Sequence, residues 1–274
     1  MRLYRTSAGA FVEADQMFYP VTAANWDELL TSSELQQRAR AAAQGEGRAS
    51  LDGLTVLAPV ESQEVWASGV TYYRSRSARM EESKDAGGGD FYDRVYYAER
   101  PELFFKSAGK RVVGSGSAVR IRRDATWSVP EPELVMLLTP KGEIAGYTIG
   151  NDMSSRDIEG QNPLYLPQAK NYDGACALGP CVLLATEPIA KSTKIAITIL
   201  RDGKALFSGE TSMAEMKREL KELASYLFRE CSFSDGVFLM TGTGVVPPDN
   251  FTLAAGDVIR ITIDGIGTLE NHVA

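Results

Sequence analysis

From residue 56 onward the sequence consists mainly of short β-rich runs separated by turn residues, and this pattern limits the folds open to the chain. The runs include AVRIRR, ELVMLLT, IAGYTIG, CVLLAT and KIAITILRDGKALFSGE. Short strands with a turn about every 8 to 12 residues are typical of a barrel or a rolled sheet, whereas a doubly wound parallel sheet alternates strands with long helices. Asp202-Gly203 and Asp264-Gly265 predict the turns of two hairpins.

The first 60 residues have a different pattern. MRLYRTSAGAFVEADQMFYPV alternates as short strands do, and NWDELLTSSELQQRARAAAQ predicts one or two helices that begin near Asn25 and Ser32. We therefore expect a small N-terminal α/β domain over residues 1–60 and a second, larger domain over residues 61–274.

Two segments of the second domain depart from the strand pattern. Residues 212–231 predict a single helix, because Ser212 and Glu215 form a capping box and apolar residues recur along one face. Residues 81–94 contain three consecutive glycines, which offer nothing to pack. They predict a mobile loop that is either a lid over a site or a plain surface insertion.

Charge and composition restrict what the protein binds. The net charge is -7, which argues against nucleic acid or an anionic membrane as a partner, since both require clustered Lys and Arg. A small anionic substrate is compatible with a local cation. No apolar run approaches the roughly 18 residues of a membrane span, and the N-terminus lacks the apolar region of a signal peptide. We therefore expect a cytoplasmic protein.

Cysteine and histidine are scarce. The three cysteines have no CxxC spacing, which indicates buried thiols rather than disulfides or a zinc site. The only histidine is His272, near the C-terminus, where we expect it on the surface. A Ser-His or Cys-His mechanism would have to use this residue.

Acidic residues stand at the ends of two apolar runs. Glu131 and Glu133, separated by Pro132, precede one run, and Asp152 ends the next. Residues i and i+2 of a strand point to the same side, so Glu131 and Glu133 project together. Like charges there must face solvent, share a proton or hold a cation. The three carboxylates suit Mg²⁺, with Mn²⁺ or Ca²⁺ possible, and the lack of His and Cys argues against zinc; an exposed strand edge is the alternative.

Five motifs carry a resemblance to a known family. PEPELVMLL, GYTIGNDMSSRD, KNYDGACALGP, TGTG and GIGTLEN follow one another in this order. Together they resemble the fumarylacetoacetate hydrolase family over about residues 60–274. The resemblance implies an α+β fold, a mixed β-roll or barrel with a small N-terminal α/β domain. It also implies a divalent metal held by Glu131, Glu133 and Asp152, and a homodimer or homotetramer.

The segment GVTYYRSRSA departs from the family pattern. Members that hydrolyse carbon-carbon bonds carry a His and a Glu that activate water, and here Ser75 and Ala78 stand at those places. A serine without a partner cannot replace the base, so a hydrolase is disfavoured. A family Gln is also replaced, by Glu159, which affects the expected substrate contacts.

The segments ERPELFFK and NDMSSRDIEGQNPLYLPQAKNYDG resemble the dehydratase branch of the family, which acts on 2-keto-3-deoxy sugar acids. The resemblance implies that Lys170 and Glu102 are the acid/base pair. A metal-chelated 2-keto acid has an acidic C3 proton, which Lys170 would remove with a lowered pKa, while a protonated Glu102 would help the C4 hydroxyl leave as water.

Three further residues are predicted to contact the substrate. Arg156 either binds the substrate carboxylate or neutralises Asp157. Thr243 lies in TGTG between glycines that allow close approach to a ligand, and Lys106 lies in LFFK.

Three functions follow from these observations. The leading hypothesis is a Mg²⁺-dependent dehydratase that converts 2-dehydro-3-deoxy-D-arabinonate to 2,5-dioxopentanoate in pentose catabolism. The second is a hydrolase or decarboxylase of acylpyruvates or related diketo acids. The third is a non-enzymatic, metal-dependent protein that only binds a keto acid.

Overall fold

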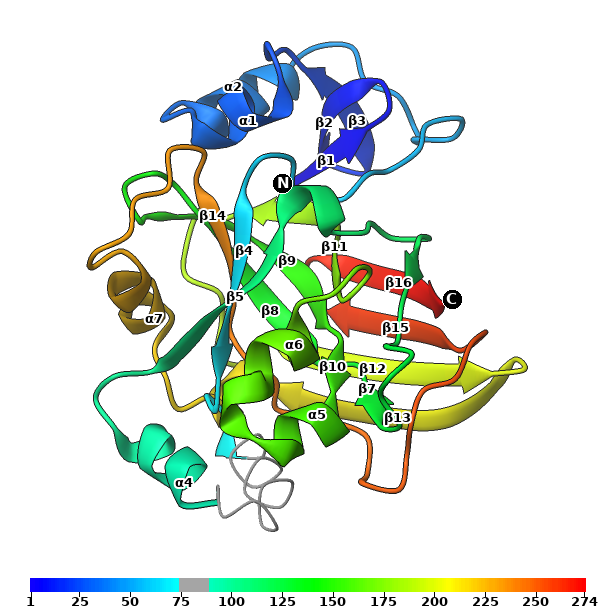
Figure 1. Ribbon diagram of the computed structural model, residues 1–274. Helices are drawn as coiled ribbons and strands as arrows, with labels where there is room; N and C mark the ends of the chain where they lie inside the picture. The colour runs from blue at the N-terminus through cyan, green and yellow to red at the C-terminus, as the bar shows by residue number, and fades with distance from the viewer. Residues whose placement is uncertain (74–88) are drawn as a thin grey trace.

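Two large sheets form most of the computed structural model, which describes residues 1–73 and 89–274 (Figure 1). Ser75 and Ala78 lie outside the described residues. The strands of the larger sheet, in spatial order, are β3 (Met17–Val21), β2 (Gly9–Ala14), β1 (Arg2–Thr6), β11 (Cys176–Leu184), β9 (Ile144–Asp152), β8 (Pro132–Leu138), β14 (Val237–Met240), β4 (Glu64–Gly69) and β5 (Glu102–Ala108). Those of the smaller sheet are β13 (Lys204–Ser212), β12 (Lys194–Arg201), β15 (Val258–Ile263), β16 (Gly267–Val273) and β6 (Ala118–Val119). A two-stranded ribbon pairs β7 (Ser128–Val129) with β10 (Ser154–Ser155).

The larger sheet is mixed, because β14 pairs in parallel with β4 and antiparallel with β8. Among the described residues neither sheet closes on itself: β3 and β5 are the edges of one, and β13 and β6 are the edges of the other. The predicted α+β roll with a small N-terminal α/β unit is confirmed, but its strands do not form a closed barrel.

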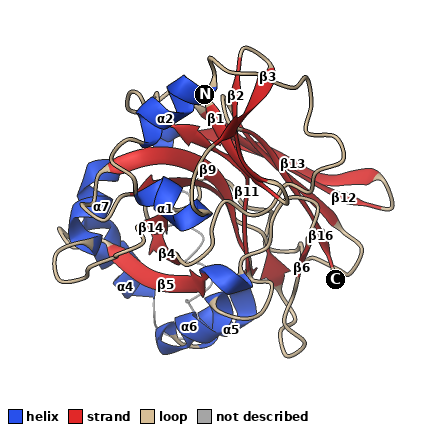
Figure 2. Cartoon of the chain, turned by 90° about the horizontal axis from the view of Figure 1, so that it is seen from above, coloured by secondary structure: helices blue, strands red, loops and turns tan. Residues whose placement is uncertain are grey.

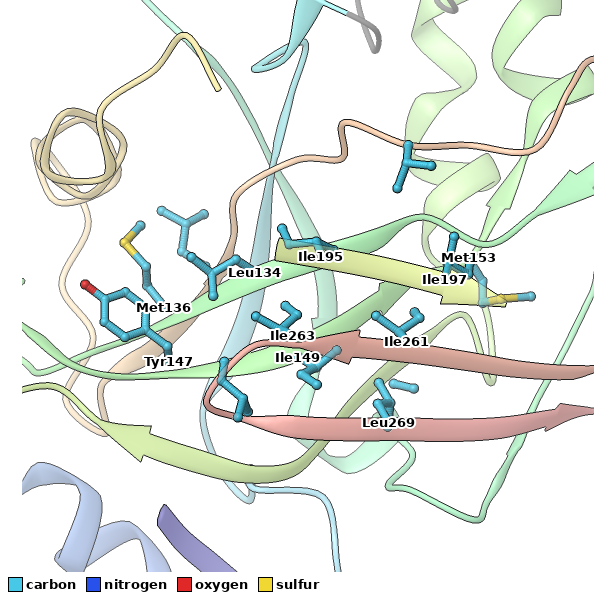
Figure 3. Packing of buried hydrophobic residues seen from close by; sticks show 14 of the residues in the cluster. Leu134, Met136, Tyr147, Ile149, Met153, Ile195, Ile197, Ile261, Ile263 and Leu269 are labelled. Carbon is cyan, nitrogen blue, oxygen red and sulfur yellow. The ribbon is translucent and has the colours of Figure 1, made fainter. Parts of the chain in front are cut away.

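The main core lies between the two sheets. Leu134 and Met136 of β8 face this layer together with Ile149 of β9, and they pack near Ile197 of β12 and Ile261 of β15 (Figure 3). Successive strand residues point to opposite faces, so Val135 and Leu137 of β8 belong to a second cluster on the other face. Both faces of β8 are therefore buried, as its uninterrupted apolar run requires.

The N-terminal strands extend the larger sheet through the β1–β11 pairing. Two helices, α1 (Trp26–Thr31) and α2 (Leu35–Ala42), cover the second cluster with residues such as Leu29 and Leu35. The Asn25 side chain caps α1 by accepting from the Glu28 amide at 2.8 Å, as predicted. The second helix begins at Leu35 instead of near Ser32, because the Ser32 hydroxyl accepts from the Glu34 amide and forms a local turn.

The other helices are short: α4 (Gly89–Tyr97), α5 (Arg156–Gln161), α6 (Leu166–Lys170) and α7 (Leu220–Leu227). Single 3₁₀ turns occur at Gly109–Arg111, Pro163–Tyr165 and Met213–Glu215. Seen from above, the helices lie mainly on one side of the molecule and the far ends of β12 and β13 on the other (Figure 2).

The single helix predicted over residues 212–231 is wrong in its first half. Strand β13 continues to Ser212, which pairs with Lys194. Met216 then forms a β-bridge with Tyr72, and the Lys217 amide donates to the Thr71 carbonyl at 2.9 Å. These long-range backbone contacts outweigh the local capping box, so the helix begins only at Leu220.

The loop predicted over residues 81–94 is partly corrected as well. Residues 81–88 lie outside the described residues, but residues 89–94 belong to α4. The two predicted hairpins are confirmed. Asp202 and Gly203, both with positive φ, join β12 to β13, and Asp264-Gly265 lies between β15 and β16.

The scarce residue types occupy contrasting positions. Cys176 and Cys181 are free and buried as predicted, but Cys231 is exposed because it follows α7 at the surface. His272 is exposed on β16, as expected. No helix within residues 1–73 and 89–274 is long and apolar enough to cross a membrane.

Candidate active site

Three carboxylates converge where β8 begins and β9 ends. Pro132 pairs with Asn151 across these strands, and the backbones of Glu131 and Asp152 exchange hydrogen bonds of 3.2 and 3.0 Å. Glu131, Glu133 and Asp152 are 6, 1 and 1% exposed. One oxygen from each carboxylate lies within 4.8 Å of the others. The structure thus brings together the three predicted metal ligands and excludes an exposed strand edge.

Burial and mutual repulsion disfavour full ionisation of this cluster. Burial raises the pKa of Glu133 well above its ordinary value, and the nearby charges of Asp152 and Glu131 raise it further. The Lys170 ammonium and the Gly242 amide, which donates to Glu133 Oε2 at 2.6 Å, act in the opposite direction. A buried set of like charges is stabilised when it binds a positive ion.

The geometry of the three carboxylates suits a hard divalent ion. Metal–oxygen bonds are about 2.0 to 2.1 Å long for Mg²⁺ and about 2.3 to 2.6 Å for Ca²⁺, so two oxygens on one ion lie at most about 4 Å or about 5 Å apart, respectively. The three carboxylate oxygens lie within 4.8 Å of one another, so small movements of the side chains would bring them onto either ion. The donors are all carboxylate oxygens, which such ions prefer.

Lys170 is the last residue of α6 and is fully buried among acceptors. Its Nζ lies 2.9 Å from Glu131 Oε2, 3.1 Å from Asp152 Oδ2, 2.5 Å from Ser154 Oγ and 3.3 Å from Glu159 Oε1. A solvated surface lysine is therefore excluded. The amine stands beside two of the three carboxylates, as a base acting on a metal-bound substrate would.

Lys106 is also fully buried, and it owes its position to a β-bulge in β5. Trp66 of β4 pairs with Phe105 and Val65 pairs with Ser107, so Lys106 is the additional residue. Its Nζ lies 2.5 Å from Asp152 Oδ1 and donates to the carbonyls of Met153 at 3.0 Å and Lys170 at 2.5 Å. These three acceptors match the three N–H donors of the ammonium.

Arg156 lies on α5 and contacts the carboxylate cluster. Its Nη2 is 2.7 Å from Glu131 Oε1, and its Nη1 is 3.6 Å from Glu159 Oε2. The Asp157 carboxylate points elsewhere, because it accepts from the Thr126 amide at 2.6 Å and the Thr126 hydroxyl at 2.9 Å. The geometry favours a role for Arg156 within the site over neutralisation of Asp157.

Glu102 and Thr243 come from β5 and from the loop after β14. Glu102 is half-buried at the start of β5 and pairs with Gly69, where a Cβ would overlap the Glu102 carboxylate. Phe104, on the same face of β5, has its ring 6.0 Å from Lys170 Nζ. Thr243 is buried after β14, and its hydroxyl donates to the Val245 carbonyl at 2.9 Å.

Sequence reasoning missed two groups that the fold brings to the site, Ser154 and the Gly242 amide, and it identified Glu159 only as a replaced family residue, without its partners. Ser154 contacts Lys170, the Gly242 amide contacts Glu133, and Glu159 contacts both Lys170 and Arg156. Helical spacing could have shown that Glu159 and Arg156 share a face, since i and i+3 are neighbours on a helix. No local signal connects Gly242 with Glu133, which is 109 residues away along the chain.

Comparisons with known proteins agree with this architecture. The chain is 48% identical over 216 residues to the probable 2-keto-3-deoxyxylonate dehydratase of Haloferax volcanii, covering 78% of this chain and 73% of the relative. It is 41% identical over 225 residues to the 2-dehydro-3-deoxy-D-arabinonate dehydratase of Saccharolobus solfataricus, covering 81% and 76%.

A solved structure of similar fold carries a ligand. The 2-keto-3-deoxy-D-arabinonate dehydratase complexed with magnesium and 2,5-dioxopentanoate matches with a TM-score of 0.85 and 32% identity, covering 100% of this chain and 98% of that one. Residues 64–274 match the family described as Fumarylacetoacetate (FAA) hydrolase C-terminal. This protein therefore belongs to the fumarylacetoacetate hydrolase family.

Proposed function

We propose that this protein is a Mg²⁺-dependent hydro-lyase that converts 2-dehydro-3-deoxy-D-arabinonate to 2,5-dioxopentanoate. The observation that carries the proposal is the buried contact of one lysine amine, Lys170, with Glu131 and Asp152 of the carboxylate cluster. The chain also resembles dehydratases of 2-keto-3-deoxy pentonates over most of its length.

Glu131, Glu133 and Asp152 would hold the Mg²⁺, with Mn²⁺ or Ca²⁺ as chemically similar substitutes. When bound, the ion would polarise the 2-keto group and so make the C3 proton more acidic. The three side chains would also fix the position of the ion and, through it, the orientation of the keto acid. Their separation of at most 4.8 Å supports this assignment.

Lys170 and Glu102 would move the protons. The Lys170 amine would take the proton from C3, and the Glu102 carboxylic acid would give a proton to the C4 hydroxyl as it leaves as water. The atoms balance, since one C3 hydrogen and the C4 hydroxyl leave together, and tautomerisation then gives the C5 aldehyde. The packing of Phe104 against Lys170 supports a common site, because Phe104 and Glu102 share a face of β5.

Arg156, Thr243 and Lys106 would complete the substrate pocket. Arg156 has guanidinium donors that suit the substrate carboxylate, and Thr243 would contribute a hydroxyl from the loop after β14. For Lys106 a substrate contact would require one of its three acceptors to give way. Its stronger contribution is to orient Asp152 and the end of α6.

The remaining features of the proposal concern context. We infer a cytoplasmic protein whose partner is a small 2-keto acid, with residues 61–274 as the catalytic domain. The net charge of -7 disfavours nucleic acid and anionic membranes as partners.

A turnover screen tests the proposed function. The purified protein is incubated with a panel of 2-keto-3-deoxy acids and with acylpyruvates, with Mg²⁺ or with excess EDTA. We expect 2-dehydro-3-deoxy-D-arabinonate to yield 2,5-dioxopentanoate with Mg²⁺ only. Cleaved carboxylate products would instead identify a hydrolase or decarboxylase, and tight binding of a keto acid without turnover would identify a binding protein.

A further inference from the structure

The site contains a closed ring of ion pairs. Glu131 spans two cations, with Oε2 2.9 Å from Lys170 Nζ and Oε1 2.7 Å from Arg156 Nη2. Glu159 spans the same two cations from the other side, with Oε1 3.3 Å from Lys170 Nζ and Oε2 3.6 Å from Arg156 Nη1. Glu131 and Glu159 thus each connect Lys170, the predicted base, to Arg156, which is predicted to bind the substrate carboxylate.

The two carboxylates of the ring are not equivalent. Glu131 belongs to the three carboxylates that suit a metal ion, whereas Glu159 lies outside that group. Glu159 is 2% exposed on α5, one turn after Arg156. A carboxylate buried to this degree on a six-residue helix requires nearby positive charge, and Lys170 and Arg156 provide it.

A bound metal ion would weaken the contacts of Lys170 with Glu131 and Asp152. Of the four oxygens that described side chains place around Lys170 Nζ, two belong to Glu131 and Asp152, which would share their charge with the ion. The Ser154 hydroxyl and the Glu159 carboxylate would remain for the lysine. Only Glu159 of these two carries a charge.

We propose that Glu159 is a positioning residue that holds Lys170 and Arg156 in place relative to each other when the metal occupies its three carboxylates. The inference rests on the proposed function and deepens it, because it assigns a role in the same site to a residue outside the metal and proton-transfer groups. Glu159 would act through Lys170, which would take the C3 proton, and through Arg156, which would bind the substrate carboxylate.

The charges of the described site residues support this role. Four buried carboxylates, those of Glu131, Glu133, Asp152 and Glu159, lie near three buried cations, those of Lys106, Arg156 and Lys170. While Lys170 is protonated, before it serves as the base, a divalent ion and a singly charged keto acid would bring the sum of these charges to zero. In that state, loss of the Glu159 charge would leave one positive charge in excess, and Lys170 and Arg156 would repel each other with one bridging carboxylate fewer.

Substitution of Glu159 tests the inference. Glu159→Gln keeps the shape of the side chain and removes its charge, and Glu159→Asp keeps the charge on a shorter side chain. With Mg²⁺ and 2-dehydro-3-deoxy-D-arabinonate, we expect Glu159→Gln to lower kcat about tenfold to a hundredfold, the effect of a misplaced catalytic group. KM should change less than about threefold, because Arg156 keeps its shorter contact with Glu131.

The conservative variant and a control complete the design. Glu159→Asp should recover part of the lost kcat, and the Mg²⁺ dissociation constant measured by calorimetry should stay within about threefold of the wild type in both variants. Asp157→Asn removes a charge from the same helix on the side facing Thr126, and it should retain kcat within about twofold.

The outcomes separate this inference from the proposed function. If the wild type turns over no keto acid, the proposed function fails, and the inference fails with it. If the wild type is active and Glu159→Gln keeps more than half of its kcat, only the inference is overturned. A parallel loss of thermal stability, Mg²⁺ affinity and kcat in both variants would also overturn it, by showing a merely structural role. Should Glu159→Gln fail to fold, Glu159→Ala takes its place, and more than half of the wild-type kcat in that folded variant would overturn the inference.

Discussion

At the scale of single residues, the site pairs buried carboxylates with buried lysine and arginine side chains. Lys106 and Lys170 have no exposed surface, and each contacts Asp152, one through Oδ1 and the other through Oδ2. Their other contacts differ. Lys106 donates to two backbone carbonyls, whereas Lys170 contacts side chains. Lys106 is therefore fixed by the fold, whereas under the proposed function Lys170 is the amine that exchanges partners when a substrate binds.

Replacing Lys170 should remove the base without removing the metal site. Lys170→Met keeps roughly the volume of the side chain, and we expect kcat to fall by at least about a hundredfold, the usual effect of losing a general base. Steady-state kinetics with Mg²⁺ measures this effect, and calorimetry should show that Mg²⁺ still binds. Lys110→Met, which changes an exposed lysine, is the matched control. Near-normal dehydration by Lys170→Met would move the search for the base to Glu102.

Only part of this residue-scale arrangement could be predicted from the sequence. The strand period places Glu131 and Glu133 on one face, so their convergence follows from local geometry. The acid/base role predicted for Lys170 follows from the family resemblance, because KNYDG has no local feature that marks a buried lysine. The bridge from Glu159 to Lys170 depends on how α5 packs against α6, and sequence spacing does not determine that packing.

At the scale of secondary-structure elements, the turn after β14 connects Glu133 of the carboxylate cluster with Thr71, which follows β4. Gly242 has φ of +90° and donates its amide to Glu133 Oε2 at 2.6 Å. The Thr71 hydroxyl at the end of the β4 segment donates to the Thr241 carbonyl at 2.6 Å, and a Cβ at Gly242 would overlap that hydroxyl. Only a glycine satisfies both the backbone conformation and the space.

A matched pair of glycine substitutions tests this turn. Gly242→Ala should lower the free energy of unfolding by about 2 to 4 kcal/mol, from left-handed strain and overlap together, and should weaken Mg²⁺ binding by displacing Glu133. Gly203 has a similar φ of +75° but open space around it. Gly203→Ala should therefore lower the free energy of unfolding by only about 1 kcal/mol. Urea unfolding measures both losses. Equal losses would show that the Thr71 contact is unimportant.

Element boundaries show where tertiary contacts override local sequence signals. The turn residues predicted both hairpins correctly, because the φ preference of Asp-Gly is a property of two residues. The capping box at Ser212 is an equally local signal, yet Ser212 remains in β13 because it pairs with Lys194 of β12. The strand-rich roll was predictable from turn spacing, but the openness of both sheets was not, since closure depends on register between distant strands.

At the scale of the whole molecule, buried weak acids should limit stability at alkaline pH. Burial raises the pKa of Cys176 and Cys181 to about 12, whereas unfolded cysteine titrates near 8.5. Between these values the unfolded chain loses protons that the folded chain retains, so stability falls as pH rises. Burial also raises the pKa of Tyr72 and Tyr172, which act in the same direction above about pH 10.

The size of this effect can be measured. At pH 10 each buried thiol should reduce the free energy of unfolding by about 2 kcal/mol relative to pH 7.5. Urea unfolding at the two pH values, with a phosphine reductant present, gives the difference for the wild type and for Cys181→Ala. The variant should lose about 2 kcal/mol less than the wild type over this range. The same loss in both proteins would contradict the assignment.

Assembly is a second whole-molecule property. We expect a homodimer or a homotetramer, because closed twofold symmetry is the commonest arrangement of soluble oligomers and the family resemblance implies it. Static light scattering at micromolar concentration should give an even multiple of the chain mass of 29.8 kDa. A mass equal to one chain would contradict the expectation.

The contrast among the three cysteines gives the protein a single chemical handle. Cys176 and Cys181 are shielded by the core, and Cys231 stands exposed beyond α7. Brief treatment with a maleimide near neutral pH would therefore place one fluorophore, biotin or surface tether on each folded chain, with no cysteine engineered out. Conjugates of defined stoichiometry would orient every immobilised chain in the same way, and one dye per chain would let photobleaching steps count the subunits of a single assembly.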